Sequence, residues 1–500
     1  MIRRRTITSY VWNSVSGNKM VILSNCIRNF FRKFELIGNS VQGENPAPDN
    51  PQEIKSAGRK SKNLLIENIS VFTVQDNIAY IPLPEGHETK LYTMLIWKKP
   101  GENDDVGFTC GFYDKSNMTA TYSAPCLQAG NLVTGNGIVN SKIGVNHFVC
   151  FSPADSRFFD IYNVMYAEGK ETTLDYEPYG YLLDVKVTGK NLLDMADIQN
   201  ENGKIDSDFS KAKSIKPFKV IKDRKYLLIS KGAMIVDVRY SSIYFGEDDL
   251  AYGQDSSRKL TTGTGYSCFI GTETRKILVA KETCTITKTM MHGTRTEKDA
   301  YEVEELGLFE IINDNPNIDY QPYTEQFAKI ALDEPLRGIG EYKDVLTKDG
   351  VVRKIKRIVF DGSEDEKWVI NNERENVIRF IPHQFGDAIK INDYQRSMID
   401  KLKWVSGVWN RDEVGQDMFA GILRINMPKT LTPDLQTFRT WLSQNPLTVD
   451  YVLAEPVTEL LPESVQQQLQ ALHSENGTTH VFVDSGEVGT GINIEYKYKS

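Results

Sequence analysis

The sequence contains few of the residues from which catalytic and metal sites are built. Its six cysteines lie between Cys26 and Cys284 without a C-x-x-C pair, and its six histidines form no H-x-x-x-H motif. A G-x-S-x-G nucleophile elbow is missing, and the glycine runs lack the lysine of a phosphate-binding loop. We therefore predict a non-enzymatic protein with no metal, no cofactor and no catalytic triad, and we interpret the cysteines as reduced core thiols.

Long apolar runs are missing as well. The N-terminal stretch offers only the apolar residues "MVIL" before polar Ser24 and Asn25, which is too short for the core of a signal peptide. No stretch approaches the ~18 apolar residues that a membrane-spanning helix needs. We expect a chain that is made in the cytoplasm without a signal peptide and that does not insert into a membrane.

Helical periodicity is scarce before residue 385. Segments such as "KLYTMLIW" (90–97), "KYLLIS" (225–230), "MIVDVRY" (234–240) and "RKILVA" (275–280) instead alternate apolar and polar residues, and Gly, Asp and Asn turns separate them. Later, "NDYQRSMIDKLKWV" (392–405) and "TPDLQTFRTWLSQN" (432–445) predict helices, the second with Thr432 and Asp434 at its start. The pattern predicts a mostly β fold: tandem jelly-roll-like β-sandwich modules followed by a mixed α+β C-terminal domain.

An internal repeat organises the chain. "KNLL" occurs at 62–65 and 190–193, and each copy precedes one Asp-Tyr-x-Pro-Tyr phrase, which begins at Asp175 or Asp319. Because proline lacks a backbone donor, each phrase is expected to close a module after its last strand, with the tyrosines covering the end of the sandwich. The predicted division is a basic N-terminal attachment segment with a Pro-rich linker (1–60), sandwich modules at 61–182 and 183–325, and the mixed domain at 326–500.

Charge is distributed unevenly. Residues 1–60 hold ten Lys or Arg against four Asp or Glu, whereas the whole chain has a net charge of -8. An acidic body argues against nucleic-acid binding, and the basic start suits either docking to an acidic partner or simple solvation. The stretch "GENPAPDNPQEIKSAG" (43–58) is predicted to be an extended linker.

Five phrases carry a resemblance to a known family: "FELIGNSVQGENPAPDNPQEIKSAG", "DYEPY", "GKNLLD", "EPLRGIGEYKDVLTKDGVVRKIKRIVFDGSEDEKW" and "FRTWLSQNPLTVDYVLAEP". Together they resemble minor structural tail or baseplate proteins of phages and prophages of Gram-positive bacteria. The resemblance implies a virion protein whose carbohydrate-binding-module-like sandwiches help to attach the tail to the host. It also implies other tail or baseplate proteins as partners and a homo-oligomer, a trimer or higher.

Non-catalytic glycan binding requires exposed aromatic faces beside a few polar groups. The candidate glycan-binding residues are Tyr92, Trp97 and Tyr113 in the first module, Tyr240, Tyr244 and Tyr252 in the second, and Trp404 and Trp409 in the third domain. Trp409 has the most polar, turn-forming neighbours. The acidic loop "GEDDLAYGQD" (246–255) is either a calcium or sugar-binding loop or a solvated turn.

Three functions remain open. The first is adhesion, in which the chain binds host cell-surface polysaccharide. The second is purely structural, with the modules acting as baseplate spacers and another protein binding the receptor. The third is a polysaccharide depolymerase, which needs two carboxylates facing each other across a cleft. We favour adhesion.

Overall fold

The computed structural model describes the chain from Lys19 to Tyr496 with gaps. The described residues are 19–26, 29–65, 73–75, 78–99, 102, 109–113, 126–128, 136–141, 145–150, 158–170, 176–203, 205, 212–233, 241–251, 253–262, 268–269, 273–293, 302–311, 314–383, 385–390, 396–474 and 477–496. None of the helices in these ranges is long and apolar enough to cross a membrane. The chain is mostly β, as predicted.

The chain forms two compact units. Unit 1 comprises Met1–Ala57, Asp184–Lys329 and Leu336–Ser500, and unit 2 comprises Gly58–Leu183 and Ile330–Pro335. The chain therefore passes between the two units four times. Segments that are distant in sequence, including both ends of the chain, belong to unit 1.

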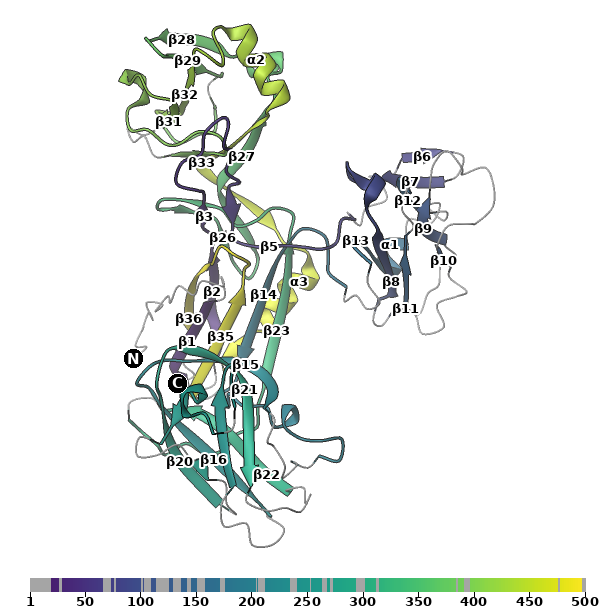
Figure 1. Cartoon of the computed structure of the whole chain (residues 1–500), viewed down its shortest axis with the longest axis vertical. Coiled ribbons are helices and arrows are strands. Elements are labelled where there is room, and N and C mark those ends of the chain that lie inside the picture. Colours follow the sequence, from purple (N-terminus) through teal and green to yellow (C-terminus); the bar gives the residue numbers. More distant parts are fainter. Residues whose placement is uncertain are drawn as a thin grey trace. The chain divides into compact units, whose positions relative to one another are not determined.

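Unit 2 contains the first β-sandwich. One antiparallel sheet has the order β10-β9-β12-β7-β6 and the other has the order β11-β8-β13 (Figure 1). Between them lies an aromatic core in which Tyr92, Phe112 and Tyr162 are fully buried. The elements are β5 (Arg59–Lys60), β6 (Thr73–Gln75), β7 (Ile78–Pro82), β8 (Tyr92–Lys98), β9 (Thr109–Tyr113), β10 (Cys126–Gln128), β11 (Asn136–Asn140), β12 (His147–Cys150), α1 (Phe158–Ile161) and β13 (Tyr162–Glu168).

The second β-sandwich lies in unit 1. Its sheets have the orders β15-β21-β17-β19 and β18-β20-β16-β22. Figure 1 labels β15 and β21 of the first sheet and β16, β20 and β22 of the second. The predicted strands at 225–230 and 275–280 are confirmed as β16 and β20, while the one at 234–240 lies outside the described residues. The strands are β15 (Lys213–Val220), β16 (Lys225–Ala233), β17 (Ser241–Gly246), β18 (Leu260–Thr261), β19 (Cys268–Phe269), β20 (Glu273–Ala280), β21 (Cys284–Gly293) and β22 (Glu302–Glu310).

The two K-N-L-L segments make the same hydrogen bonds in both sandwiches. The side-chain oxygen of buried Asn63 accepts the backbone N–H two residues further on (2.9 Å), and its Nδ2 donates to the carbonyl of Val164 on β13 (3.4 Å). Asn191 accepts the equivalent N–H (3.0 Å) and donates to the carbonyl of Leu306 on β22 (3.4 Å). Each buried asparagine thus joins the start of its module to the last strand, and its own polar atoms are satisfied.

The repeated closing phrases cover a sheet face rather than the end of the sandwich. The ring of Tyr176 packs edge-on against Trp97, with centroids 6.0 Å apart, and Tyr320 packs in the same way against Phe309 at 6.3 Å. Both pairs belong to small apolar clusters on the face of the sheet that points away from the main core. The phrase recurs because each module has the same apolar outer face to cover. Asp175 lies outside the described residues, so only the second phrase is described in full.

Strands from both ends of the chain share sheets in unit 1. β1 pairs with β35, and β2 pairs with β36, so the N-terminal segment is part of the β-structure from Lys19 onward. One sheet has the order β1-β35-β14-β23; the other has the order β30-β33-β27-β26-β2-β34, with β36 beside β2. The strands are β1 (Lys19–Cys26), β2 (Asn29–Ile37), β14 (Tyr181–Thr188), β23 (Glu325–Leu332), β26 (Val345–Leu346), β27 (Gly350–Phe360), β30 (Ser397–Ile399), β33 (Leu447–Leu460), β34 (His473–Ser474), β35 (Gly477–Asp484) and β36 (Gly491–Tyr496).

The Pro-rich stretch predicted as a linker is packed instead. Ile54 and Ala57 are buried, and the backbone N–H of Gln52 donates to the carbonyl of Asp400 (2.6 Å). Small strand pairs frame this stretch: β3 (Ser40–Val41) with β4 (Lys55–Ser56), and β24 (Gly338–Ile339) with β25 (Tyr342–Lys343). The prolines correctly indicated an extended chain. The contacts of its apolar residues could not be read from composition.

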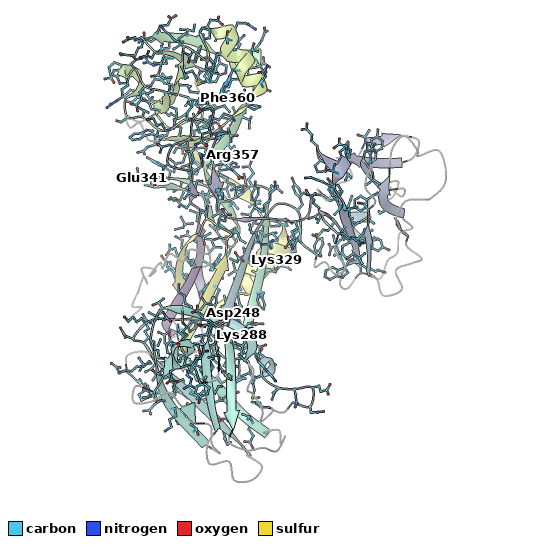
Figure 2. The ribbon with its side chains drawn as sticks, in the orientation of Figure 1. Asp248, Lys288, Lys329, Glu341, Arg357 and Phe360 are labelled. Carbon is cyan, nitrogen blue, oxygen red and sulfur yellow. The ribbon has the colours of Figure 1, made fainter. Side chains whose placement is uncertain are left out.

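Strand β27 carries a buried ion pair and part of a hydrophobic core. Arg357 donates to both carboxylate oxygens of fully buried Asp450 on β33 (2.7 and 2.9 Å), while Phe360, further along β27, belongs to the core of the C-terminal region (Figure 2). A two-pronged arginine–carboxylate pair fixes geometry as well as charge.

The C-terminal region is mixed α and β. A four-stranded sheet, β28-β29-β32-β31, packs its apolar face against helix α2 (Figure 1). The helix begins after Asp434, whose side chain caps the N–H of Thr437 (2.8 Å), as the sequence predicted. The helix expected at 392–405 is wrong: residues 397–399 form β30, because pairing with β33 outweighs the helical spacing. The remaining elements are β28 (Val369–Glu373), β29 (Val377–Ile381), β31 (Gly415–Phe419), β32 (Ile422–Pro428), α2 (Leu435–Gln444) and α3 (Glu463–Ala471).

Candidate functional site

Two exposed tryptophans lie on one loop of the C-terminal region. Trp404 is 40% exposed and Trp409 is 46% exposed, although large aromatic side chains are normally well buried. Between them, Val405 and Val408 are buried and anchor the loop to the protein. We call residues 403–413, which form most of the connection from β30 to β31, the tryptophan loop.

The loop lies on a sheet whose two faces differ sharply. Ile378, Phe380, Met418, Leu423, Ile425 and Met427 point to the core, whereas the outer face carries four polar side chains, three of them buried and the fourth half-buried. The outer-face residues are Arg379 on β29, Asp417 on β31, and Arg424 and Asn426 on β32. Arg424 donates to both oxygens of Asp417 (2.7 and 2.8 Å). Buried polar groups of this kind are costly unless they are fully hydrogen-bonded, so a network here needs partners.

The tryptophan loop supplies those partners. The Nδ2 group of Asn426 lies within 3.1 Å of three loop carbonyls, those of Val408 (3.0 Å), Arg411 (3.0 Å) and Glu413 (3.1 Å). Asp417 accepts the backbone N–H of Val408 (3.0 Å). These bonds fix the backbone of the loop against the sheet.

Arg379 holds the turn that carries Trp409. Its guanidinium donates to the backbone carbonyls of Val408 (3.3 Å) and of Trp409, so a buried positive charge lies directly beneath this turn. Burial lowers the pKa of Arg379, and the neighbouring charges of Arg424 and Arg374 act in the same direction.

Gly407 allows the indole of Trp409 to pack against the backbone of the turn. Its φ of +64° lies in the left-handed region, and a Cβ at this position would lie 3.7 Å from Nε1 of Trp409. The indole therefore packs along the glycine backbone. Trp409 is thus a preorganised aromatic face, which is the arrangement that sugar-ring binding requires.

The other predicted binding residues are placed differently. Tyr92 is fully buried, and Tyr244 is 5% exposed with the Arg258 guanidinium 3.8 Å from its ring centroid, so neither offers a free face to a sugar. We remove both from the candidate set: Tyr92 points into the core of the first sandwich, and Tyr244 is covered in a small cluster with Leu250 and Met290 on the other face of β17. Trp97 is half-buried against its partner ring on the closing phrase. The side chain of Tyr113, and Tyr240 and Tyr252 entirely, lie outside the described residues.

The acidic loop after β17 is a set of ion pairs. Asp248 lies 3.9 Å from Nζ of Lys288 (Figure 2). Its neighbours also pair with cations: Glu247 with Lys259 (3.2 Å) and Asp255 with Arg258 (2.9 Å). Among the described residues, no group of three His, Cys, Asp or Glu side chains is arranged to hold a metal. These surface ion pairs favour the interpretation of this loop as a solvated turn.

Sequence reasoning found the tryptophans but missed the residues that hold them. A signal for these residues existed in "LRINM" (423–427), where polar Arg424 and Asn426 alternate with apolar residues of a strand. Such alternation usually indicates a solvent-facing side. Only the structure shows that another loop of the same chain covers it.

Comparisons with known proteins add no assignment. No family model matches the sequence, and no curated protein matches it. Two solved structures of infectious bursal disease virus align with the chain. The structure of the Gt strain is 8% identical to this chain, and the alignment covers 98% of this chain and 82% of the viral chain with a TM-score of 0.11. The structure of the T13 viral particle is also 8% identical, and the alignment covers 99% of this chain and 83% of the viral chain with a TM-score of 0.11. Likenesses this weak carry no argument about fold or function.

Proposed function

We propose that this chain is a tail or baseplate protein of a phage or prophage of Gram-positive bacteria, and that it binds host cell-surface glycan without catalysis. The five sequence phrases support the virion role. Tail and baseplate proteins would be its partners, and a homo-oligomer of three or more copies would sum weak sites into firm attachment.

The single observation that carries glycan binding is the tryptophan loop. Trp404 and Trp409 are exposed, and the turn that carries Trp409 is held by buried Arg379, Asp417 and Asn426. A sequence gains no core stability from two solvent-facing indoles, whereas a sugar ring gains an apolar face to stack on. The proposal moves the binding surface from the sandwich modules to the C-terminal region.

Binding of the purified full chain to intact Gram-positive cells tests the proposal. The double variant Trp404→Ala with Trp409→Ala should lower affinity at least about tenfold, since central aromatic contacts dominate binding energy. Phe327→Ala is the matched control, because Phe327 is an aromatic residue on β23 that is 59% exposed and lies away from the loop in sequence. Equal binding by the double variant and the wild type would contradict the proposal.

A structural spacer role is the alternative that a specific observation favours. Strands from both chain ends share sheets, and β14 and β23 belong to the same sheet although about 140 residues separate them. Sheets that join distant segments of the chain suit a rigid connector between neighbouring tail proteins. This alternative predicts that the protein is present in purified virions while the isolated chain binds no host cells.

A further inference from the structure

The charge of the tryptophan loop indicates which glycans it would accept, an inference that rests on the proposed function. From Trp404 to Arg411 the sequence is "WVSGVWNR", and Arg411 is its only ionisable side chain. Arg411 is exposed, and its Nε donates to the carbonyl of Ser406 (3.0 Å). The guanidinium is thereby fixed over the same turn that carries Trp409.

Arg411 keeps donors available for a ligand. Among the described residues, no carboxylate pairs with it, and its two terminal nitrogens have no hydrogen-bond partner. The guanidinium presents its donors as a rigid fork that matches carboxylate and phosphate oxygens, and a single bond to a backbone carbonyl leaves one edge of that fork open.

The carboxylates next to Arg411 in sequence are already engaged. Asp412 accepts the backbone N–H and the Nδ2 of Asn376 (2.9 and 2.7 Å), and Glu413 pairs with Lys403 (2.7 Å). Neither neutralises Arg411 directly. Asp412 keeps its charge because Asn376 is neutral, but within residues 404–411 the only ionic group that a ligand on the indoles would meet is the cation of Arg411.

Buried charge reinforces this preference. Arg379 lies beneath the turn, and within the described part of the chain no carboxylate is within ion-pair distance of it; its partners are amide and carbonyl oxygens. Because a buried charge is screened less by salt than an exposed one, it adds positive potential at the loop surface.

We propose that the tryptophan loop selects glycans that carry an anionic group, a phosphodiester or a carboxylate, and that Arg411 is the residue that recognises this group. The indoles contribute stacking to any sugar ring, and the arginine separates charged from neutral polymers. Charge-assisted, two-pronged hydrogen bonds to an anion are stronger than neutral ones and lose strength in salt.

The test measures binding of the full chain to polysaccharide extracted from Gram-positive cell walls in three forms. One is untreated, one has its phosphodiesters cleaved with hydrofluoric acid, and one has its carboxylates reduced to alcohols. Arg411→Gln should weaken binding to the untreated polymer about tenfold, and Arg411→Lys should restore part of it. Arg32→Gln, at an exposed arginine on β2, is the matched control and should leave binding unchanged.

The three forms also separate the two anions and the two proposals. Loss of binding to the phosphodiester-free form identifies phosphate, and loss to the reduced form identifies carboxylate; either supports the inference when Arg411→Gln removes the same difference. Equal binding to all three forms, with loss only in Trp409→Ala, overturns the inference and leaves glycan binding intact. Binding to none of the forms overturns both.

Discussion

Replacing His480 should make the protein less sensitive to acid. His480 lies on β35 between Ile22 of β1 and Thr188 of β14, and its side chain is fully buried. Neither ring nitrogen has a hydrogen-bond partner, and neither does the hydroxyl of neighbouring Thr188. Burial lowers the pKa of His480 to about 3, with the positive charge of Arg224 acting in the same direction.

The sign of the effect follows from proton binding. The unfolded chain takes up a proton on this histidine near pH 6.5, but the folded chain does so only near pH 3, so the contribution to stability is complete above pH 6.5 and declines as pH falls. At pH 4.5 the loss amounts to about 2.7 kcal/mol, from two pH units at about 1.36 kcal/mol each. Burial also raises the pKa of Glu310, which pairs with Arg224, and this raised pKa makes the protein more stable, not less, as pH falls. Glu310 is present in both wild type and variant, so its effect cancels in the comparison.

The assay compares wild type, His480→Leu and the exposed-histidine control His383→Gln. Amide exchange of Val481 and Val483 on β35 reports the free energy of opening at pH 7.5 and 4.5. Between these pH values, wild type and the control should lose about 2.7 kcal/mol more than His480→Leu. Parallel losses in all three proteins would refute the reasoning.

Two further predictions concern the modules and the C-terminal region. Asn191→Ala leaves two backbone N–H groups and two backbone carbonyls of the second sandwich without their side-chain partner. The free energy of unfolding of the protein, measured by urea titration, should therefore fall by about 3 kcal/mol. A loss below about 1 kcal/mol would contradict the role given to Asn191. Gly362→Ala and Gly203→Ala both place a side chain at positive φ, which costs about 1–2 kcal/mol, but only at Gly362 would the new Cβ overlap a backbone carbonyl of α2. Calorimetry should therefore show a larger drop in Tm for Gly362→Ala than for Gly203→Ala. Equal drops would count against the packing of Gly362 on α2.

Much of the fold could be predicted because strand alternation reflects burial on one face. β8, β16 and β20 lie where the apolar-polar alternation placed them, and α2 begins at its predicted cap. Pairing between the chain ends could not be predicted, because nothing in the sequence of β1 specifies β35 as its neighbour. The helix expected at 392–405 failed for a related reason: Ile399 and Leu402 are spaced as in a helix, yet they reach the same core from a short strand and a turn.

The site was predictable only in part. Trp409 stood out because polar, turn-forming residues surround it, and it is exposed. Tyr92 and Tyr244 could not be told from exposed tyrosines in the sequence. The direction of Tyr92 depends on strand register, which a single sequence leaves open, and the cover over Tyr244 comes from Leu250 and Arg258 further along the chain. The roles of Arg379 and Asn426 could not be identified from strand alternation alone, because their partners are backbone carbonyls of the tryptophan loop.

The most direct test of the account is binding of the labelled full chain to intact Gram-positive cells before and after chemical removal of wall polysaccharide. The account predicts strong binding to untreated cells, loss of most of it after removal, and at least about tenfold weaker binding of the Trp404→Ala, Trp409→Ala variant to untreated cells. Binding that persists on stripped cells, or that the double variant retains, would contradict glycan binding by the tryptophan loop.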